Sequence, residues 1–191
     1  MPSLNRLGNL RLSKWRDRQE PSTEPNRTSH PDIENRGKLL ATDHEYFMEI
    51  ALQEADLALK HGDVPIGALC VYNNQIVSQR HNEKEMKQDA TAHAEILALR
   101  DASARLGMLY LEGVTLYSTL EPCLMCAGSL VLTRCTRVVF GAFDLKGGAT
   151  SSLYNLCCDP RLNFEVDVVS GILEQNCAIK LSTFFSQLRS S

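Results

Sequence analysis

The sequence predicts a three-layer α/β/α fold, in which helices cover both faces of a mixed five-stranded sheet. Strand-like and helix-like segments alternate after a hairpin, a pattern typical of a sheet packed between helices. The 191 residues are 43% hydrophobic and 23% charged, which suits one ordinary globular domain. Apolar runs stay well below the roughly 20 residues of a membrane span, so we expect no membrane partner.

Two segments differ in composition. Residues 1–40 are rich in Asn, Arg, Ser, Pro and Glu, and are predicted to form a flexible N-terminal extension. Before Asp17 this extension has no acidic residue and mixes leucines with Arg and Lys. An organellar transit peptide and a short RNA-binding arm are therefore alternatives to a plain tail. Residues 41–191 are predicted to form the folded domain.

Charge and cysteine content limit the function classes. Residues 1–38 carry eight Lys or Arg and five Asp or Glu, whereas residues 39–191 carry twelve and eighteen. An acidic folded part argues against coating long nucleic acids, so a nucleic-acid partner should be bound over a small footprint. The seven cysteines lack the regular spacing of a secreted disulfide scaffold, so we expect free thiols or metal ligands in a reducing, cytoplasmic setting.

The first elements have clear local signals. Thr42 and Glu45 have the spacing of a capping box, and apolar residues then recur with helical period as far as His61. The segment 64–82 predicts two antiparallel strands. Its turn falls at Asn73-Asn74, a residue type that tolerates positive φ.

The rest of the domain alternates between helix and strand. Helices are marked by apolar residues three or four positions apart, and strands by short runs rich in β-branched residues. Proline at the start of "PCLMCAG" also favours a helix start. The expected elements are a helix over 92–106, a strand over 114–120, a helix over 123–135 opened by Pro122, strands over 137–143 and 164–170, and a helix over 172–188.

His93 and Glu95 stand two positions apart at a predicted helix start. On the flank of a helix, residues i and i+2 point to nearly opposite sides. At the first turn, however, both side chains can converge on the space beyond the helix N-terminus. Cys123 and Cys126 lie one turn apart at another predicted helix start, so we expect the two helix starts to meet.

One imidazole and two thiolates provide three zinc ligands, the number found in catalytic sites that leave the fourth position for water. Zinc lowers the pKa of such a water from 15.7 towards roughly 7. His93 could instead serve only as a helix cap and Glu95 only to complement the helix dipole, and Cys135 or another cysteine could close a purely structural zinc site. The combined pattern, H-x-E followed by P-C-x-x-C, favours a zinc deaminase.

From about His44 to the C-terminus, the sequence closely resembles the bacterial tRNA adenosine deaminase family. The likeness rests on "VPIGA", "DATAHAEILALR", "TLEPCLMCAG", "RVVFGAFDLKGGA" and the "FF" of the closing helix. It implies a cytidine-deaminase-like fold and a homodimer with one zinc ion per subunit. It also implies conversion of the wobble adenosine of a tRNA anticodon to inosine, usually in arginine tRNA.

The resemblance assigns roles to individual residues. His93, Cys123 and Cys126 match the zinc ligands, and Glu95 matches the proton shuttle that serves a zinc-bound hydroxide. The matched substrate contacts are Val64, Pro65, Ile66 and Asn82 around the base and ribose, Asp144 and Lys146 in a loop that meets the flanking nucleotides, and Phe184 and Arg189 in the closing helix.

Three positions depart from the family pattern. Phe143 stands where an arginine is usual, and Ser186 and Leu188 stand where more basic residues are usual. These differences bear on tRNA binding rather than on the chemistry.

Two other functions use the same motifs. A deaminase of free guanine or cytosine would need the same zinc and glutamate, but the "MCAG" segment and the Asp144 loop resemble the tRNA enzymes more closely. A non-catalytic, zinc-stabilised RNA-binding subunit would not need Glu95. We therefore expect a tRNA adenosine deaminase.

Overall fold

Five strands form one mixed sheet in the computed structural model, which describes residues 41–190; the predicted extension over 1–40 lies outside the described residues. The strand order is β2-β1-β3-β4-β5. β1 pairs antiparallel with β2 and β3, whereas β3, β4 and β5 are mutually parallel. The strands are β1 (Gly67–Tyr72), β2 (Gln75–His81), β3 (Thr115–Leu120), β4 (Arg137–Ala142) and β5 (Asp167–Val169).

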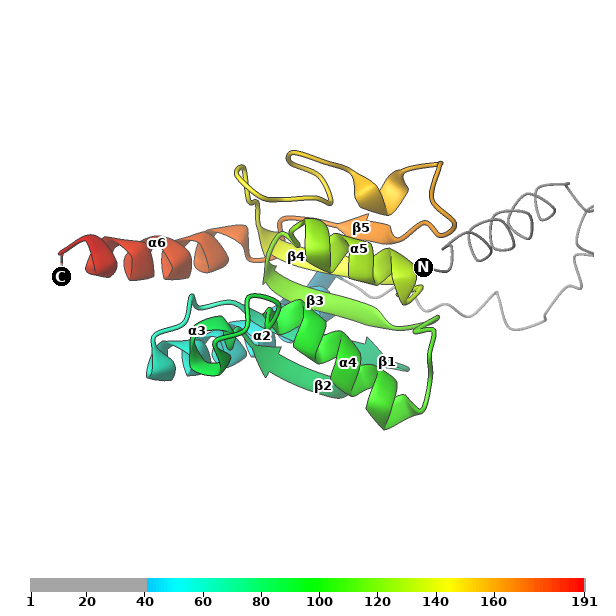
Figure 1. Ribbon diagram of the computed structural model, residues 1–191, viewed down its shortest axis with the longest axis horizontal. Helices are drawn as coiled ribbons and strands as arrows, with labels where there is room; N and C mark the ends of the chain where they lie inside the picture. Colours follow the sequence, from blue (N-terminus) through cyan, green and yellow to red (C-terminus); the bar gives the residue numbers. More distant parts are fainter. Residues whose placement is uncertain (1–40, 191) are drawn as a thin grey trace, which may run out of the picture. The chain divides into compact units, whose positions relative to one another are not determined.

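Helices cover both faces of this sheet, as the sequence predicts. α4 (Ala94–Leu106) and α5 (Leu124–Leu132) lie on the near side in Figure 1. α2 (Ala41–Ala58) and α6 (Glu174–Ser190) pack on the other face. Side chains alternate along β1, so that Ala68 and Cys70 join the core under α4 while Leu69 and Val71 join the core under α2. No helix among the described residues is long and apolar enough to cross a membrane.

The predicted hairpin turn is confirmed. Asn73 and Asn74 both adopt left-handed backbone conformations, with φ of 49° and 62°. Two successive residues with positive φ match the twist of antiparallel strands, and asparagine tolerates this region better than most residues. The turn fixes β2 against β1 and so positions Asn82, which follows β2.

Several element ends differ from the prediction. α2 includes Ala41, one residue before the predicted cap at Thr42. Pro122 precedes α5 rather than opening it, because Cys123 occupies the N-cap position. Only Asp167–Val169 of the predicted strand 164–170 pairs with β4. These ends depend on tertiary partners of the backbone, which local patterns do not contain.

Short helices were not predicted. α3 (Lys84–Lys87) has no buried residue, so it lacks an apolar period. The single-turn 3-10 helix η3 (Leu156–Cys158) is also new, whereas η2 (Leu59–His61) is a 3-10 turn at the end of the helix predicted as far as His61. The carboxyl ends of the parallel strands β3 and β4 meet at one sheet edge, where Leu120 pairs with Ala142. The residues that follow both strands form the candidate site.

Candidate metal centre and its surroundings

His93 and Cys123 occupy the N-cap positions of α4 and α5. Both have extended backbone conformations, and neither side chain makes a capping hydrogen bond. Their backbone carbonyls accept the first helical hydrogen bonds, from Leu97 and Ala127, at 3.0 and 2.8 Å. The imidazole and the thiol can therefore point beyond the helix starts, which meet as predicted.

Three ligand atoms converge between these helix starts. The His93 Nδ1 atom lies 3.7 Å from Cys123 Sγ and 3.6 Å from Cys126 Sγ, and the two sulfur atoms lie 3.7 Å apart. A tetrahedral zinc ion with bonds of about 2.3 Å to sulfur and about 2.0 Å to nitrogen holds such atoms about 3.5–3.8 Å apart. The donor set and its spacing therefore fit zinc.

The two thiols have opposite pKa shifts. The pKa of Cys123 is lowered to about 3, chiefly by its contact with the Cys126 thiol and also by His93 beside it. The pKa of Cys126 is raised by the same contact and by burial. A bound divalent cation favours the thiolate form of both cysteines.

Glu95 is 4% exposed and lies in the first turn of α4. The Ser118 hydroxyl of β3 donates a hydrogen bond of 3.4 Å to its Oε1 atom. Burial raises the pKa of this carboxyl, and the proximity of His93 only partly opposes that shift. A carboxyl whose pKa moves towards neutrality can both accept and return a proton.

The alternative of a closed site with Cys135 is wrong. Cys135 is buried, and its Sγ atom faces the carbonyl oxygens of Val114 and Arg137 at 3.3 and 3.4 Å. Among the residues that the structure describes, His93, Cys123 and Cys126 are the only group of three such side chains that converges. Three protein ligands leave a position for water.

Glu121 organises the loop after β4, a role that the sequence did not predict. Its carboxylate is 1% exposed and accepts hydrogen bonds from the backbone amides of Asp144, Thr150, Ser151 and Ser152, at 2.8–3.3 Å. The hydroxyls of Thr150 and Ser152 also donate to it. The loop 144–152 is therefore held against Glu121, which directly precedes Pro122 and Cys123.

Replacing Glu121 with glutamine is expected to lower the free energy of unfolding by about 2–4 kcal/mol, because several buried amides lose a charged acceptor. Burial alone raises the pKa of Glu121, but hydrogen bonds from Ser152 and other loop groups outweigh it and lower the pKa. The difference in the free energy of unfolding between Glu121→Gln and wild type should therefore shrink as the pH falls through the pKa that Glu121 has in the folded protein.

Chemical denaturation at several pH values measures this effect, with hydrogen exchange over 144–152 as a local readout. Glu112→Gln is the matched control, because its carboxylate is exposed and pairs only with Arg134 at the surface. Equal stability of both variants at neutral pH would contradict the role of Glu121.

The segment Val64–Ile66 is held by another buried carboxylate, Asp63. Its oxygens accept hydrogen bonds from the amides of Glu85 and Met86, at 2.7 and 3.0 Å. The Asn82 amide donates to the Val64 carbonyl oxygen at 3.4 Å. The structure thus brings together the predicted contacts Val64, Pro65, Ile66 and Asn82. Asp63 also contacts the His61 imidazole at 2.9 Å and accepts a hydrogen bond from the Asn82 amide at 3.5 Å.

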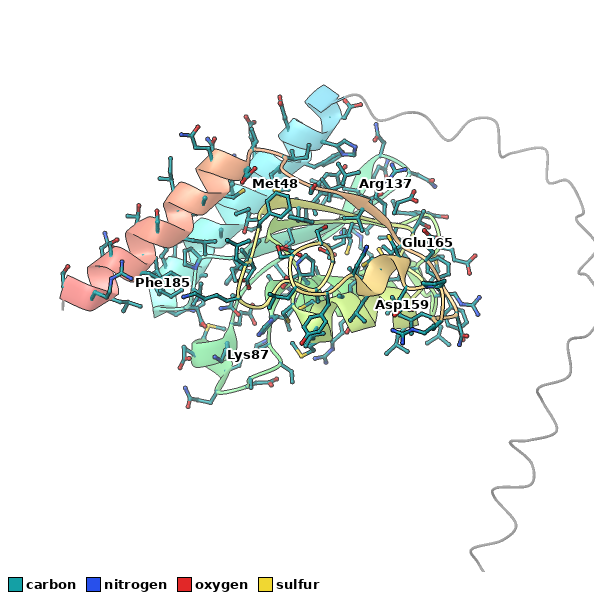
Figure 2. The ribbon with its side chains drawn as sticks, turned by 90° about the horizontal axis from the view of Figure 1, so that it is seen from above. Met48, Lys87, Arg137, Asp159, Glu165 and Phe185 are labelled. Atoms are coloured by element: carbon teal, nitrogen blue, oxygen red, sulfur yellow. The ribbon has the colours of Figure 1, made fainter. Side chains whose placement is uncertain are left out.

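The other predicted substrate contacts lie in the turn after β4 and on α6. Asp144 accepts hydrogen bonds from the amides of Lys146 and Gly147, at 3.0 and 3.1 Å, so its carboxylate shapes its own turn. Phe184 and Arg189 lie on α6, on the opposite sheet face from α4 and α5. Figure 2, with Met48 on α2 and Phe185 on α6, shows these two helices side by side.

The Phe184 ring is 9% exposed and lines a groove of about 640 Å³ between α2 and α6. Its neighbour Phe185 is 43% exposed. Arg189 lies near the end of α6, where its guanidinium donates to the Ser186 hydroxyl at 3.4 Å. None of these contacts involves the three convergent ligands.

Comparison with known proteins identifies relatives of this arrangement. Residues 41–142 match the family described as the cytidine and deoxycytidylate deaminase zinc-binding region. The tRNA-specific adenosine deaminase of Bacillus subtilis is 50% identical over 148 residues, which cover 78% of this chain and 92% of the relative. That of Aquifex aeolicus is 46% identical over 147 residues, covering 77% and 97%.

Solved structures support the same fold. A structure from a study of A-to-I editing by tRNA:A34 deaminases at the wobble position has a TM-score of 0.69 and 41% identity, covering 71% of this chain and 99% of that one. A guanine deaminase from Nitrosomonas europaea has a TM-score of 0.61 at 20% identity, covering 76% and 84%. The second likeness shows a shared fold alone.

Proposed function

The chain belongs to the cytidine and deoxycytidylate deaminase family and, within it, to the tRNA-specific adenosine deaminases, and we propose that it converts the wobble adenosine of a tRNA anticodon to inosine. The observation that carries this conclusion is the convergence of His93, Cys123 and Cys126 beside the buried Glu95. Three ligands and one poised carboxyl suit hydrolysis rather than a structural role.

In this proposal, His93 Nδ1 and the two thiolates would hold zinc, which would supply a water of lowered pKa. Glu95 accepts a proton from the water that attacks C6 of the adenine. It delivers that proton to N1, then takes the remaining proton of the same water from the new C6 hydroxyl and passes it to the departing amine, so that water and adenosine yield inosine and ammonia. Ser118 holds the carboxyl in place through its hydroxyl.

The substrate contacts remain predictions. Val64, Pro65, Ile66 and Asn82 form one supported segment that could line the base and ribose. Asp144 and Lys146 belong to the turn over Cys123 and are assigned to the flanking nucleotides, and Phe184 and Arg189 to the stem-loop. Arginine tRNA is the proposed substrate. All seven cysteines are free, which supports a reducing compartment, and we propose the cytoplasm.

Substrate choice is tested by incubating the protein with guanine, cytosine and an anticodon stem-loop carrying a wobble adenosine. Ammonia release should be confined to the stem-loop, with inosine as the product. Sequencing of arginine tRNA with and without the protein tests the natural substrate. Release of ammonia from guanine or cytosine alone would establish the rival activity.

We also propose a homodimer that uses the exposed side of α5. This helix contains no charged residue, and Leu124 and Leu132 are 50% and 78% exposed. Gly128 lies between them on the same helix face, and a Cβ atom there would meet nothing within 4 Å. Such an apolar stripe suits a second copy of the same surface.

Replacing Leu132 with glutamate is expected to convert the dimer to monomers, because two buried charges would face each other across a symmetric interface. Light scattering after size-exclusion chromatography measures the mass. Leu188→Glu is the matched control, since Leu188 is also exposed, at 58%, but lies on α6. A monomeric wild type, or a Leu132→Glu dimer, would contradict this interface.

A further inference from the structure

Phe143 is an exposed aromatic residue at the end of β4. Its side chain is 40% exposed, whereas Phe140, three residues earlier and within β4, is fully buried. The two rings meet edge to face, with centroids 5.2 Å apart and an interplanar angle of 90°. This contact holds the Phe143 ring in a defined position while part of it faces solvent.

The backbone around Phe143 is tied to the metal centre. Ala142, just before it, pairs with Leu120, and the amide of Asp144, just after it, donates to Glu121 at 3.0 Å. The turn that follows closes through a 2.9 Å bond from the Gly148 amide to the Asp144 carbonyl. Gly148 in turn forms a β-bridge with Cys123. Phe143 therefore lies at the base of a turn whose far end contacts a zinc ligand.

Phe143 also lies on the sheet face that α4 and α5 cover. Val138 packs in the core shared with α4 and α5, and Phe140 points to the same face because side chains alternate along a strand. Phe143 packs on Phe140 at the carboxyl end of β4. The exposed ring is thus at the sheet edge, and on the helix layer, where the three ligands converge.

We propose that Phe143 is a stacking platform for a base next to the wobble adenosine, an inference that rests on the proposed function. A target base must leave its stack to reach the metal centre, and its neighbours then lose a stacking partner. An aromatic face offers a replacement for any base, and such contacts carry much of single-stranded RNA binding. A ring fixed in advance loses little entropy on binding.

The test compares the KM and kcat of wild type and Phe143→Leu on the stem-loop RNA. We expect the KM to rise about 5- to 100-fold, with kcat nearly unchanged, because stacking persists from bound substrate to transition state. Tyr46→Leu is the matched control: Tyr46 is 58% exposed and packs edge-on to buried Phe47 at 5.3 Å, but on α2. Its KM should not change.

Stem-loops with an abasic site at the nucleotide 5′ or 3′ of the adenosine test whether Phe143 stacks on an RNA base or only packs against Phe140 within the protein. One of these RNAs should raise the wild-type KM by the same factor as Phe143→Leu, and combining both changes should add nothing further. Wild-type KM values unaffected by either abasic site, or additive losses, would overturn the stacking role even if Phe143→Leu were unstable. Failure of wild type on the intact stem-loop would instead overturn the proposed function.

Discussion

Replacing Glu95 with glutamine is expected to abolish deamination while leaving zinc bound. The amide has nearly the shape of the carboxylate, but it cannot accept a proton from water or return one to the leaving amine. General acid–base groups contribute about 10²–10⁴-fold in rate, so turnover should fall by at least this factor. Inosine formation on the stem-loop measures turnover, and metal analysis measures zinc.

Ser118→Ala is a graded comparison for this result. It removes the 3.4 Å hydrogen bond that orients Glu95 but leaves the carboxyl itself in place. Its rate should therefore fall far less than that of Glu95→Gln, with unchanged zinc. Normal turnover in Glu95→Gln would exclude Glu95 as the proton carrier, and loss of zinc there would mean that its role is structural.

The sequence predicts the metal-ligating residues of this site better than the buried carboxylates that hold the surrounding loops. His93, Cys123 and Cys126 can be identified from sequence because metal ligands are restricted to a few residue types at fixed spacing. The Asn73-Asn74 turn is predictable because few residues accept positive φ. The mixed sheet also follows, since the hairpin requires antiparallel pairing and the later helices allow parallel pairing.

The buried carboxylates could not be predicted in the same way. Glu121 is bound by amides that lie 23–31 residues further along the chain, and any residue except proline provides such an amide. Two partners of Asp63 are likewise amides, about 22 residues away, although His61 also contacts it locally. A long-range bond to backbone leaves no pattern of residue types. The residues of "DLKGGATSS" therefore give no sign in the sequence that Glu121 holds this loop in place.

Replacing Cys123 with serine is expected to remove zinc and, with it, all activity. A serine hydroxyl stays protonated at neutral pH, so the metal would lose one of its two thiolate ligands. Zinc content per subunit should fall before any global unfolding is seen, because Cys123 lies at a helix start rather than in the core. Cys158→Ser is the matched control, since Cys158 is an exposed thiol outside the cluster.

Metal removal from the wild type makes a complementary test, because the ligands link two separate helices. Exhaustive chelation should abolish inosine formation, and added zinc should restore it. Without the metal, nothing fixes the His93 imidazole to the two thiols except weak contacts at 3.6–3.7 Å. Hydrogen exchange at the starts of α4 and α5 should then speed up, while the sheet stays protected. A fully active, metal-free protein, or full zinc occupancy in Cys123→Ser, would rule out this metal centre.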